Sequence, residues 1–274
     1  MRSDVVRSDA GSAGSFGSWL RAVGAEHLIP TWTPAASPSG GADGVRSDRH
    51  LACSDAVARF IVFEGGEASG KSTQASRLAA RLGAVHTREP GGTAIGAGLR
   101  SLLLDARTTG LADRAEALLM AADRAQHVAE VVRPALDQGD HVVCDRYIGS
   151  TLAYQGHGRG LPVVDLKRIS AWAADDLWPD LIVLLDVPPE VAAARSGGPR
   201  DRMEAAGDDF HDRVARGYRA LASTDPLHWV TVDGTGSADE VEAAVWRAIA
   251  ARLPELAPAP RIGDEPTAAD DGSS

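Results

Sequence analysis

Length, composition and charge exclude several classes of protein for this chain. Its 274 residues are 44% hydrophobic and 24% charged, which is ordinary for a globular protein. The net charge of −10 argues against nonspecific binding to nucleic acid, which requires an excess of basic residues. No run of apolar residues approaches the roughly 18 needed to cross a membrane, and the N-terminus lacks the pattern of a signal peptide. Two cysteines are too few for a disulfide framework. We therefore expect a cytoplasmic protein that binds neither nucleic acid nor membranes.

The first 56 residues are rich in Ser, Gly, Ala and Pro. Such a composition buries too little apolar surface to offset the entropy of the chain, so residues 1–56 are predicted to be a disordered extension. A start codon assigned too far upstream would also explain this segment. One island within it has helical spacing and could instead form a small docking helix: Phe16, Trp19, Leu20 and Val23.

A glycine-rich motif follows the first strand-like run, Arg59–Glu64. Its pattern over residues 65–72 is G-x-x-x-x-G-K-S, and a segment of helical periodicity comes next. A strand that leads through a glycine-rich turn into a helix directs backbone N–H groups at one point, where they bind phosphate. By chance the motif arises in roughly one chain in a hundred of this length. We therefore predict a nucleotide phosphate site formed by Gly65, Gly66, Glu67, Ala68, Ser69, Gly70, Lys71, Ser72 and Thr73.

Short apolar runs alternate with segments of helical periodicity between residues 57 and 253. This alternation predicts an α/β fold with three layers, in which helices flank a five-stranded parallel sheet. The predicted strands are Arg59–Glu64, Ala84–Thr87, His141–Asp145, Leu181–Asp186 and Trp229–Val232. The predicted helices are Lys71–Leu82, Ile95–Leu104, Arg114–Gln138, Leu161–Asp176, Pro189–Arg195, Asp208–Ser223 and Ala238–Leu253. Ligands of such sheets bind at the carboxyl ends of the strands, where this chain carries polar residues.

Two further motifs follow predicted strands. Residues 87–93, TREPGGT, form a tight turn in which Arg88 offers five donors, and the simple alternative is a surface turn with a solvated arginine. Asp145-Arg146-Tyr147 follows the apolar run HVVC. A carboxylate in that place usually stands beside a metal ion, and the adjacent arginine can hold a second phosphate. Alone, this triplet is equally compatible with a structural ion pair.

Two more features follow the Asp145-Arg146-Tyr147 triplet, one directly after it and one at the end of the chain. Residues 150–156, STLAYQG, offer hydroxyls and an amide of the kind that bind the edge of a base. The tail from 254 to 274 is acidic and rich in Pro and Ala, so it is predicted to be disordered. The predicted domain therefore spans residues 57–253.

Four motifs occur in this order: GGEASGKST, TREPGGT, DRYIGSTLAYQG and PRDRMEAAGDDFHDRV. Together they resemble the motifs of bacterial thymidylate kinases, and the second and third are specific to that family. The resemblance covers about residues 59–253. It implies a P-loop kinase fold, a homodimer packed through helices, and transfer of a phosphoryl group from ATP to dTMP with Mg²⁺ as cofactor.

The resemblance also implies roles for single residues. Lys71 and the loop amides hold the ATP phosphates, while Ser72 and Asp145 serve Mg²⁺. Arg88 and Arg146 hold the phosphate of dTMP. The remaining contacts to dTMP fall on Glu67 near the 3′-hydroxyl, Tyr154 against the sugar, Arg124 at a thymine carbonyl, Thr151 and Gln155 at the pyrimidine edge, and Met120, which stands where the family usually has a stacking aromatic residue.

The loop from Arg195 to Arg202 resembles the lid that closes over ATP in this family. Some members carry an arginine inside the phosphate loop, where this chain has Ala68, so we expect the lid to supply that cation. Arg200 and Arg202 are the first candidates for stabilising charge on the transferred phosphoryl group, and Arg195 is the next. A solvated basic loop is the alternative.

We therefore expect a dTMP kinase that forms dTDP and ADP. The alternatives are a kinase for another deoxynucleoside monophosphate or for a nucleoside, a nucleotide-dependent switch, and an inactive paralogue. The Asn-Lys-x-Asp motif of a guanine-nucleotide switch does not occur in the sequence. Intact Lys71, Asp145 and Arg146 argue against an inactive protein.

Overall fold

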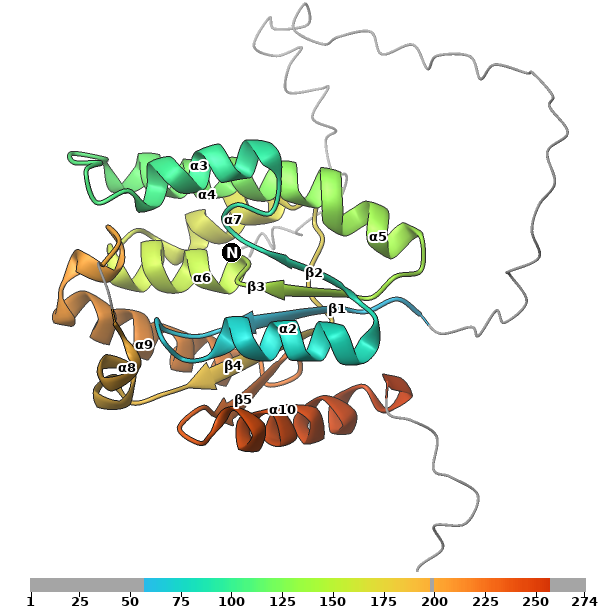
Figure 1. Ribbon diagram of the computed structural model, residues 1–274. Helices are drawn as coiled ribbons and strands as arrows, with labels where there is room; N and C mark the ends of the chain where they lie inside the picture. The colour runs from blue at the N-terminus through green and yellow to red at the C-terminus, as the bar shows by residue number, and fades with distance from the viewer. Residues whose placement is uncertain (1–56, 198–199, 257–274) are drawn as a thin grey trace, which may run out of the picture. The chain divides into compact units, whose positions relative to one another are not determined.

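Five parallel strands form the centre of the computed structural model, which describes residues 57–197 and 200–256 (Figure 1). They are hydrogen-bonded in the order β2-β3-β1-β4-β5. The strands are β1 (Phe60–Glu64), β2 (Val85–Arg88), β3 (Val142–Asp145), β4 (Leu181–Asp186) and β5 (Trp229–Asp233). The predicted five-stranded parallel sheet is confirmed, and every strand end lies within one residue of its predicted position.

The central strand β1 is buried on both faces of the sheet. Phe60 and Val62 belong to one apolar cluster, and Ile61 and Phe63 belong to another on the opposite face. This alternation follows from the period of two residues in a strand, and burial on both sides explains why the whole run is apolar.

Helices cover both faces and give three layers. One face is covered by α2 (Lys71–Leu82) and α10 (Ala238–Arg252); in Figure 1, α2 is drawn beside β1 and α10 beneath β5. The opposite face is covered by α4 (Asp113–His127), η2 (Val128–Val132), α5 (Arg133–Asp137), α6 (Ile148–Thr151), η3 (Leu152–Gly158), α7 (Val163–Ala173) and α9 (Asp208–Thr224). The remaining elements are α3 (Ala94–Leu104), α8 (Pro189–Arg195), η4 (Glu204–Ala206) and η5 (Pro254–Leu256).

The longest helical segment that was not predicted from the sequence lies at residues 148–158; the short 3₁₀ helices η4 and η5 were not predicted either. The short helix α6 continues into the π-helical η3, so that residues 148–158 form one buried helical run. Its glycines lower the helical propensity of the segment, but they allow close packing: a Cβ on Gly158 would lie 2.6 Å from a ring carbon of Phe210. Tertiary packing therefore decides the conformation here, and it places Thr151, Tyr154 and Gln155 on a helix rather than in a loop.

The predictions for the two ends of the chain lie almost entirely outside the described residues. These include the extension 1–56 with its island at Phe16–Val23, and the tail beyond residue 256. Helical structure continues through η5, slightly past the predicted domain end at 253, and Glu255 there pairs with Arg59 at 2.7 Å. Among the helices of residues 57–197 and 200–256, none has the length and apolar character of a membrane span.

Candidate active site

The loop between β1 and α2 has the geometry of a phosphate cradle. Gly65 has φ of +150°, and a Cβ there would lie 2.7 Å from the carbonyl oxygen of Leu185, so only glycine fits. Gly70, at φ +89°, turns the chain into α2. The first N–H groups of a helix have no partner within the helix and carry partial positive charge, so the start of α2 favours an anion.

Lys71 brings a buried cation to this cradle. Its Nζ donates to the carbonyl oxygen of Gly66 at 3.1 Å and lies 3.9 Å from a carboxylate oxygen of Glu67. Burial and the neighbouring charge of Arg146 lower the pKa of Lys71, while Glu67 opposes the shift. An ammonium group with little hydration binds an arriving phosphate strongly, because the surroundings screen its charge weakly.

Ser72 and Asp145 supply oxygen ligands beside the cradle. Parallel pairing of β1 with β3 places Asp145 opposite Phe63, and the Ser72 hydroxyl donates to its Oδ2. The other oxygen, Oδ1, is buried and has no hydrogen-bond partner among the described residues. Hydroxyl and carboxylate oxygens suit Mg²⁺, which in kinases usually takes its other ligands from phosphate and water. The donor set therefore fits a magnesium ion.

Arg146, the residue after Asp145, contacts the phosphate loop from the end of β3. It adopts φ of +71°, which is uncommon for a residue with a side chain and directs the guanidinium back over the loop. That group donates to the carbonyl oxygen of Gly65 at 3.0 Å and to a carboxylate oxygen of Glu67 at 2.7 Å. Burial alone would lower the pKa of Arg146, but Glu67, Tyr154, Tyr218 and Asp145 together outweigh burial and raise it. Arg146 is thus a permanent cation.

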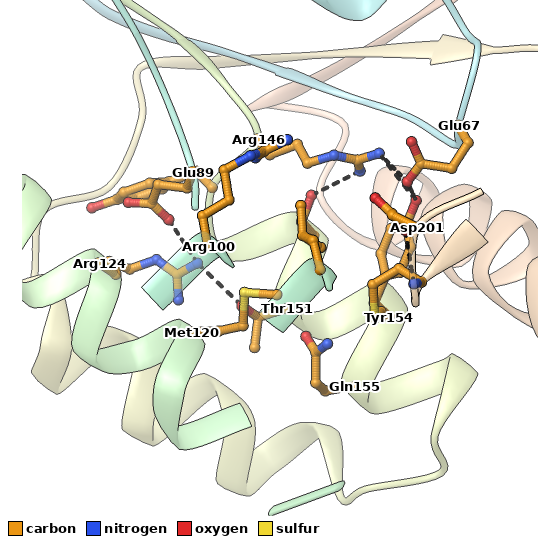
Figure 2. Close-up of a pocket in the computed structure, with 14 residues that line it drawn as sticks. Glu67, Glu89, Arg100, Met120, Arg124, Arg146, Thr151, Tyr154, Gln155 and Asp201 are labelled. Carbon is orange, nitrogen blue, oxygen red and sulfur yellow. Dashed lines mark hydrogen bonds and ion pairs between the residues drawn. The ribbon is translucent and has the colours of Figure 1, made fainter. Parts of the chain in front are cut away.

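Glu67 is shared between cation and hydroxyl donors. Its Oε1 accepts from Arg146 and, at 2.7 Å, from the hydroxyl of Tyr154 (Figure 2). Burial alone would raise the pKa of Glu67, yet Arg146, Lys71 and this hydrogen bond lower it to about 2. The structure thus brings together three residues that the sequence analysis assigned to one site.

Replacing Glu67 by Gln should reduce the loss of unfolding free energy that the protein shows as pH falls from 4.5 to about 2. The ionised carboxylate stabilises the fold above its ordinary pKa of 4.5, and this contribution is lost as pH falls to about 2. Since the side chain is partly exposed, we expect the free energy of unfolding to fall by about 2 kcal/mol near neutral pH.

Urea unfolding at a series of pH values measures this effect. The curves for wild type and Glu67→Gln should converge as pH falls from 4.5 to about 2, whereas the exposed control Glu130→Gln should follow wild type throughout. A difference that stays constant with pH would contradict the assigned ion pair.

Arginines also line the cavity between the phosphate loop and β2, whose volume is about 440 Å³. Arg88 is exposed at its edge. Arg100 from α3 was not singled out in the sequence analysis, although it is the one charged residue of that helix. It donates to the carbonyl oxygen of Pro90 at 2.9 Å, and Gly91 permits this approach because a Cβ there would lie 2.8 Å from Arg100 Cδ. Burial and then Arg88 lower the pKa of Arg100.

A smaller cavity of about 80 Å³ lies beyond Arg146 (Figure 2). Met120, Arg124, Thr151, Tyr154 and Gln155 all line it, as the sequence analysis expected of residues that share one ligand. The guanidinium of Arg124 is buried, lies 2.9 Å from Glu89 and donates to the Thr151 hydroxyl at 3.1 Å. Its Nε has no hydrogen-bond partner among the described residues, so this buried arginine retains one free donor.

Glu116 connects this cavity with the loop that carries three arginines. The amide of Gln155 donates to Glu116 at 2.8 Å, and Arg202 pairs with the same carboxylate at 2.7 Å. Arg202 also donates to the carbonyl oxygen of Leu103 at 2.7 Å. In this structure Arg202 therefore holds the loop to α3 and α4.

The other two arginines of the loop lie in different surroundings. Arg195 donates to the carbonyl oxygens of Gly234, Thr235 and Gly236 at 2.7 to 3.1 Å. It lines a third cavity, of about 340 Å³, together with residues 69–70 of the phosphate loop. Arg200 is exposed, and no hydrogen-bond or ion-pair partner lies beside it in the part of the chain that the structure describes.

A phosphate loop after the central strand of a parallel sheet, facing an arginine-lined cavity for a second anion, defines the class of P-loop phosphotransferases. The family model for thymidylate kinase matches residues 63–245. The chain belongs to the thymidylate kinase family, and it is accordingly a dTMP kinase, an enzyme that phosphorylates a nucleoside monophosphate. The resemblance read from the four sequence motifs is confirmed.

Individual relatives agree with this assignment. The thymidylate kinase of Solidesulfovibrio magneticus is 50% identical over 201 residues, which cover 68% of this chain and 96% of that protein. That of Bifidobacterium longum is 47% identical over 206 residues, covering 72% and 98%. The crystal structure of the Ehrlichia chaffeensis thymidylate kinase superposes with a TM-score of 0.58 at 30% identity and covers 70% of this chain and 98% of that one.

Proposed function

We propose that the domain at residues 57–253 transfers the γ-phosphoryl group of ATP to dTMP by in-line displacement. The observation that carries this proposal is the place of Arg146, whose guanidinium spans from the phosphate loop at Gly65 to Glu67 and Tyr154. A cation in that place would hold the acceptor phosphate and stabilise the charge that develops as the phosphoryl group is transferred. Charge neutralisation and positioning are the main demands of phosphoryl transfer.

The donor nucleotide would bind along the start of α2. The loop amides and Lys71 would hold its phosphates, and its nucleoside would enter the cavity of about 340 Å³ beside Ser69, Gly70 and Arg195. Ser72 and Asp145 would hold Mg²⁺, which when bound supplies positive charge to the phosphates.

The acceptor dTMP would lie across both remaining cavities. Its phosphate would contact Arg88, Arg100 and Arg146, which line the larger one. Its base would enter the smaller one, where the free Nε–H of Arg124 suits a thymine carbonyl. The other proposed contacts are Thr151 and Gln155 at the base edge, Met120 at the base face, Glu67 at the 3′-hydroxyl and Tyr154 at the sugar.

The reaction needs no general base in this scheme. At neutral pH the acceptor phosphate is largely a dianion, because its second pKa is about 6. One of its oxygens forms the new bond to the γ-phosphorus, and the bond to the bridging oxygen of ADP breaks. The products are dTDP and ADP, and no proton has to move.

Arg200 is our proposed source of positive charge for the transferred group. Arg195 and Arg202 already donate to carbonyl oxygens or a carboxylate. Arg200 is exposed and has no partner among the described residues, so it can turn toward a phosphate at little cost. Such an arginine stabilises charge that develops in the transition state.

We also propose a homodimer that forms through the outer helices. Exposed apolar side chains gather there: Ile95 and Leu102 on α3, Leu118 on α4, and Val164 and Trp172 on α7. Trp172 is 84% exposed, which is costly for an indole in water. The molar mass in solution tests the proposal, and Trp172→Glu with Leu118→Glu should give a monomer.

ADP release with different acceptors tests the proposed reaction. We expect ATP- and Mg²⁺-dependent turnover with dTMP that exceeds turnover with dUMP, dCMP or thymidine. A preference for dCMP would overturn the base assignment alone. Absence of turnover with every acceptor, together with nucleotide binding, would indicate a switch or an inactive paralogue instead.

A further inference from the structure

Glu64, the last residue of β1, is a buried carboxylate for which the proposed function gives no role. It is fully buried and accepts four hydrogen bonds. Oε1 accepts from the backbone N–H groups of Tyr147 and Ser150, at 3.0 and 2.9 Å. Oε2 accepts from the hydroxyls of Ser150 and Tyr218, at 2.6 and 3.0 Å. Although burial raises the pKa of Glu64, the Ser150 hydroxyl, the charge of Arg146, the Tyr147 backbone N–H and the Tyr218 hydroxyl oppose that shift and favour the charged form.

The two hydroxyls on Oε2 also contact Arg146. Its Nη1 lies 3.2 Å from the oxygen of Ser150 and 3.1 Å from that of Tyr218. A hydroxyl has one hydrogen and two acceptor lone pairs. The two hydroxyl oxygens also lie 2.9 Å from each other, where either can donate. When both hydrogens are donated to Glu64 Oε2, both oxygens turn lone pairs toward the guanidinium. By accepting both hydroxyl hydrogens, Glu64 makes Ser150 and Tyr218 acceptors for the two hydrogen bonds from Arg146 Nη1.

We propose that Glu64 is a positioning residue that holds Arg146 in its catalytic orientation through Ser150 and Tyr218. The inference rests on the proposed role of Arg146 in phosphoryl transfer. With Nη1 fixed by these hydroxyls, Nη2 is directed to Glu67 and Tyr154, at 2.7 and 3.1 Å. Within residues 57–197 and 200–256 the side-chain hydrogen bonds of Arg146 come from Nη1 and Nη2, so its Nε–H is the donor that we assign to a phosphate oxygen.

The two oxygens of Glu64 have different partners, so the role in orienting Arg146 can be tested apart from the role in supporting the fold. Oε1 joins the end of β1 to the start of α6 through backbone groups only. Among the described residues, the hydrogen bonds to Oε2 come from two side chains that also contact Arg146. The variant Glu64→Gln can keep a carbonyl oxygen in place of Oε1 and put an NH₂ group in place of Oε2. That NH₂ group would donate to both hydroxyls and turn their hydrogens toward Arg146, where donor would then face donor.

Steady-state kinetics of Glu64→Gln test the proposal. We expect kcat with dTMP to fall about 10- to 100-fold, as for loss of hydrogen bonds to a charged group, while the KM for ATP and the melting temperature stay close to wild type. The controls are Glu130→Gln, an exposed carboxylate on η2, and Ser223→Ala, an exposed hydroxyl on α9. Wild-type kcat in Glu64→Gln would overturn the proposal.

A double-mutant cycle shows whether Glu64 acts through the two hydroxyls. In a Ser150→Ala/Tyr218→Phe background, Glu64→Gln should have little further effect on kcat, because the groups that it would reverse are gone. Full additivity would overturn the proposed route. If Glu64→Gln does not fold, the Ser150→Ala/Tyr218→Phe pair alone must lower kcat at unchanged KM for ATP, and its failure to do so would be equally decisive.

Arg146→Ala distinguishes failure of this inference from failure of the proposed function. Loss of turnover in Arg146→Ala with normal turnover in Glu64→Gln would overturn the positioning role alone. Normal turnover in Arg146→Ala would overturn both.

Discussion

Replacing Arg146 by Ala should lower acceptor-dependent turnover about 1,000-fold while leaving ATP binding nearly unchanged. An arginine that stabilises charge in phosphoryl transfer contributes about that much to the rate. ATP should still bind, since the loop amides and Lys71 remain. Rates of ADP release and equilibrium binding of ATP measure the two effects separately.

Two further variants sharpen the Arg146 experiment. Arg216→Ala removes an exposed arginine of α9 and should behave as wild type. Arg146→Lys keeps the charge but loses the planar pair of donors that joins Gly65 to Glu67, so it should recover only part of the rate. If ATP affinity falls as far as kcat does, Arg146 serves the donor nucleotide rather than the acceptor.

Replacing Lys71 by Ala should have an effect of similar size, but through the donor. Lys71 is the buried cation of the phosphate loop and the next residue after the turn at Gly70. Its removal takes away the cation of the phosphate loop that would hold the transferred phosphoryl group, and we expect kcat to fall about 1,000-fold. Unlike Arg146→Ala, this variant should also weaken ATP binding.

Lys167→Ala is the matched control for Lys71, because this lysine of α7 is exposed on the surface. It should show wild-type rates and wild-type ATP affinity. An acceptor-dependent rate in Lys71→Ala within about tenfold of wild type would be too fast for loss of a phosphate-loop lysine, and would contradict the proposed donor site.

The fold was largely predictable because its signals are local. Each buried strand is a short apolar run bounded by turn residues, and the helices carry the 3.6-residue period. The exception is the run at 148–158, whose glycines and polar residues oppose a helix locally. It folds as a helix because those glycines let it pack closely on its neighbours. No rule of local propensity contains that information.

The candidate site was predictable only in part. Motif spacing predicted the phosphate loop, the Asp-Arg-Tyr triplet suggested Arg146, and family resemblance added Arg124 and Tyr154. Arg100, which lines the same cavity as Arg88 and Arg146, was not predicted, because a lone arginine in an apolar helix gives no signal of what it faces. The partners of Arg202 could not be predicted from the sequence either, since its ion pair with Glu116 joins two segments that are far apart in the chain.

The sequence by itself determined the phosphate cradle, the parallel sheet and the family, because each depends on residue types at fixed short spacing. Only the tertiary structure decided how Arg146 is held. Glu64 and Tyr218 are 154 residues apart and meet beside Ser150 because β1, α6 and α9 pack together. The hydroxyl hydrogens of Ser150 and Tyr218 are directed by this one buried carboxylate. Such a network exists only after the helices have packed on the sheet, so no pattern along the chain could record it.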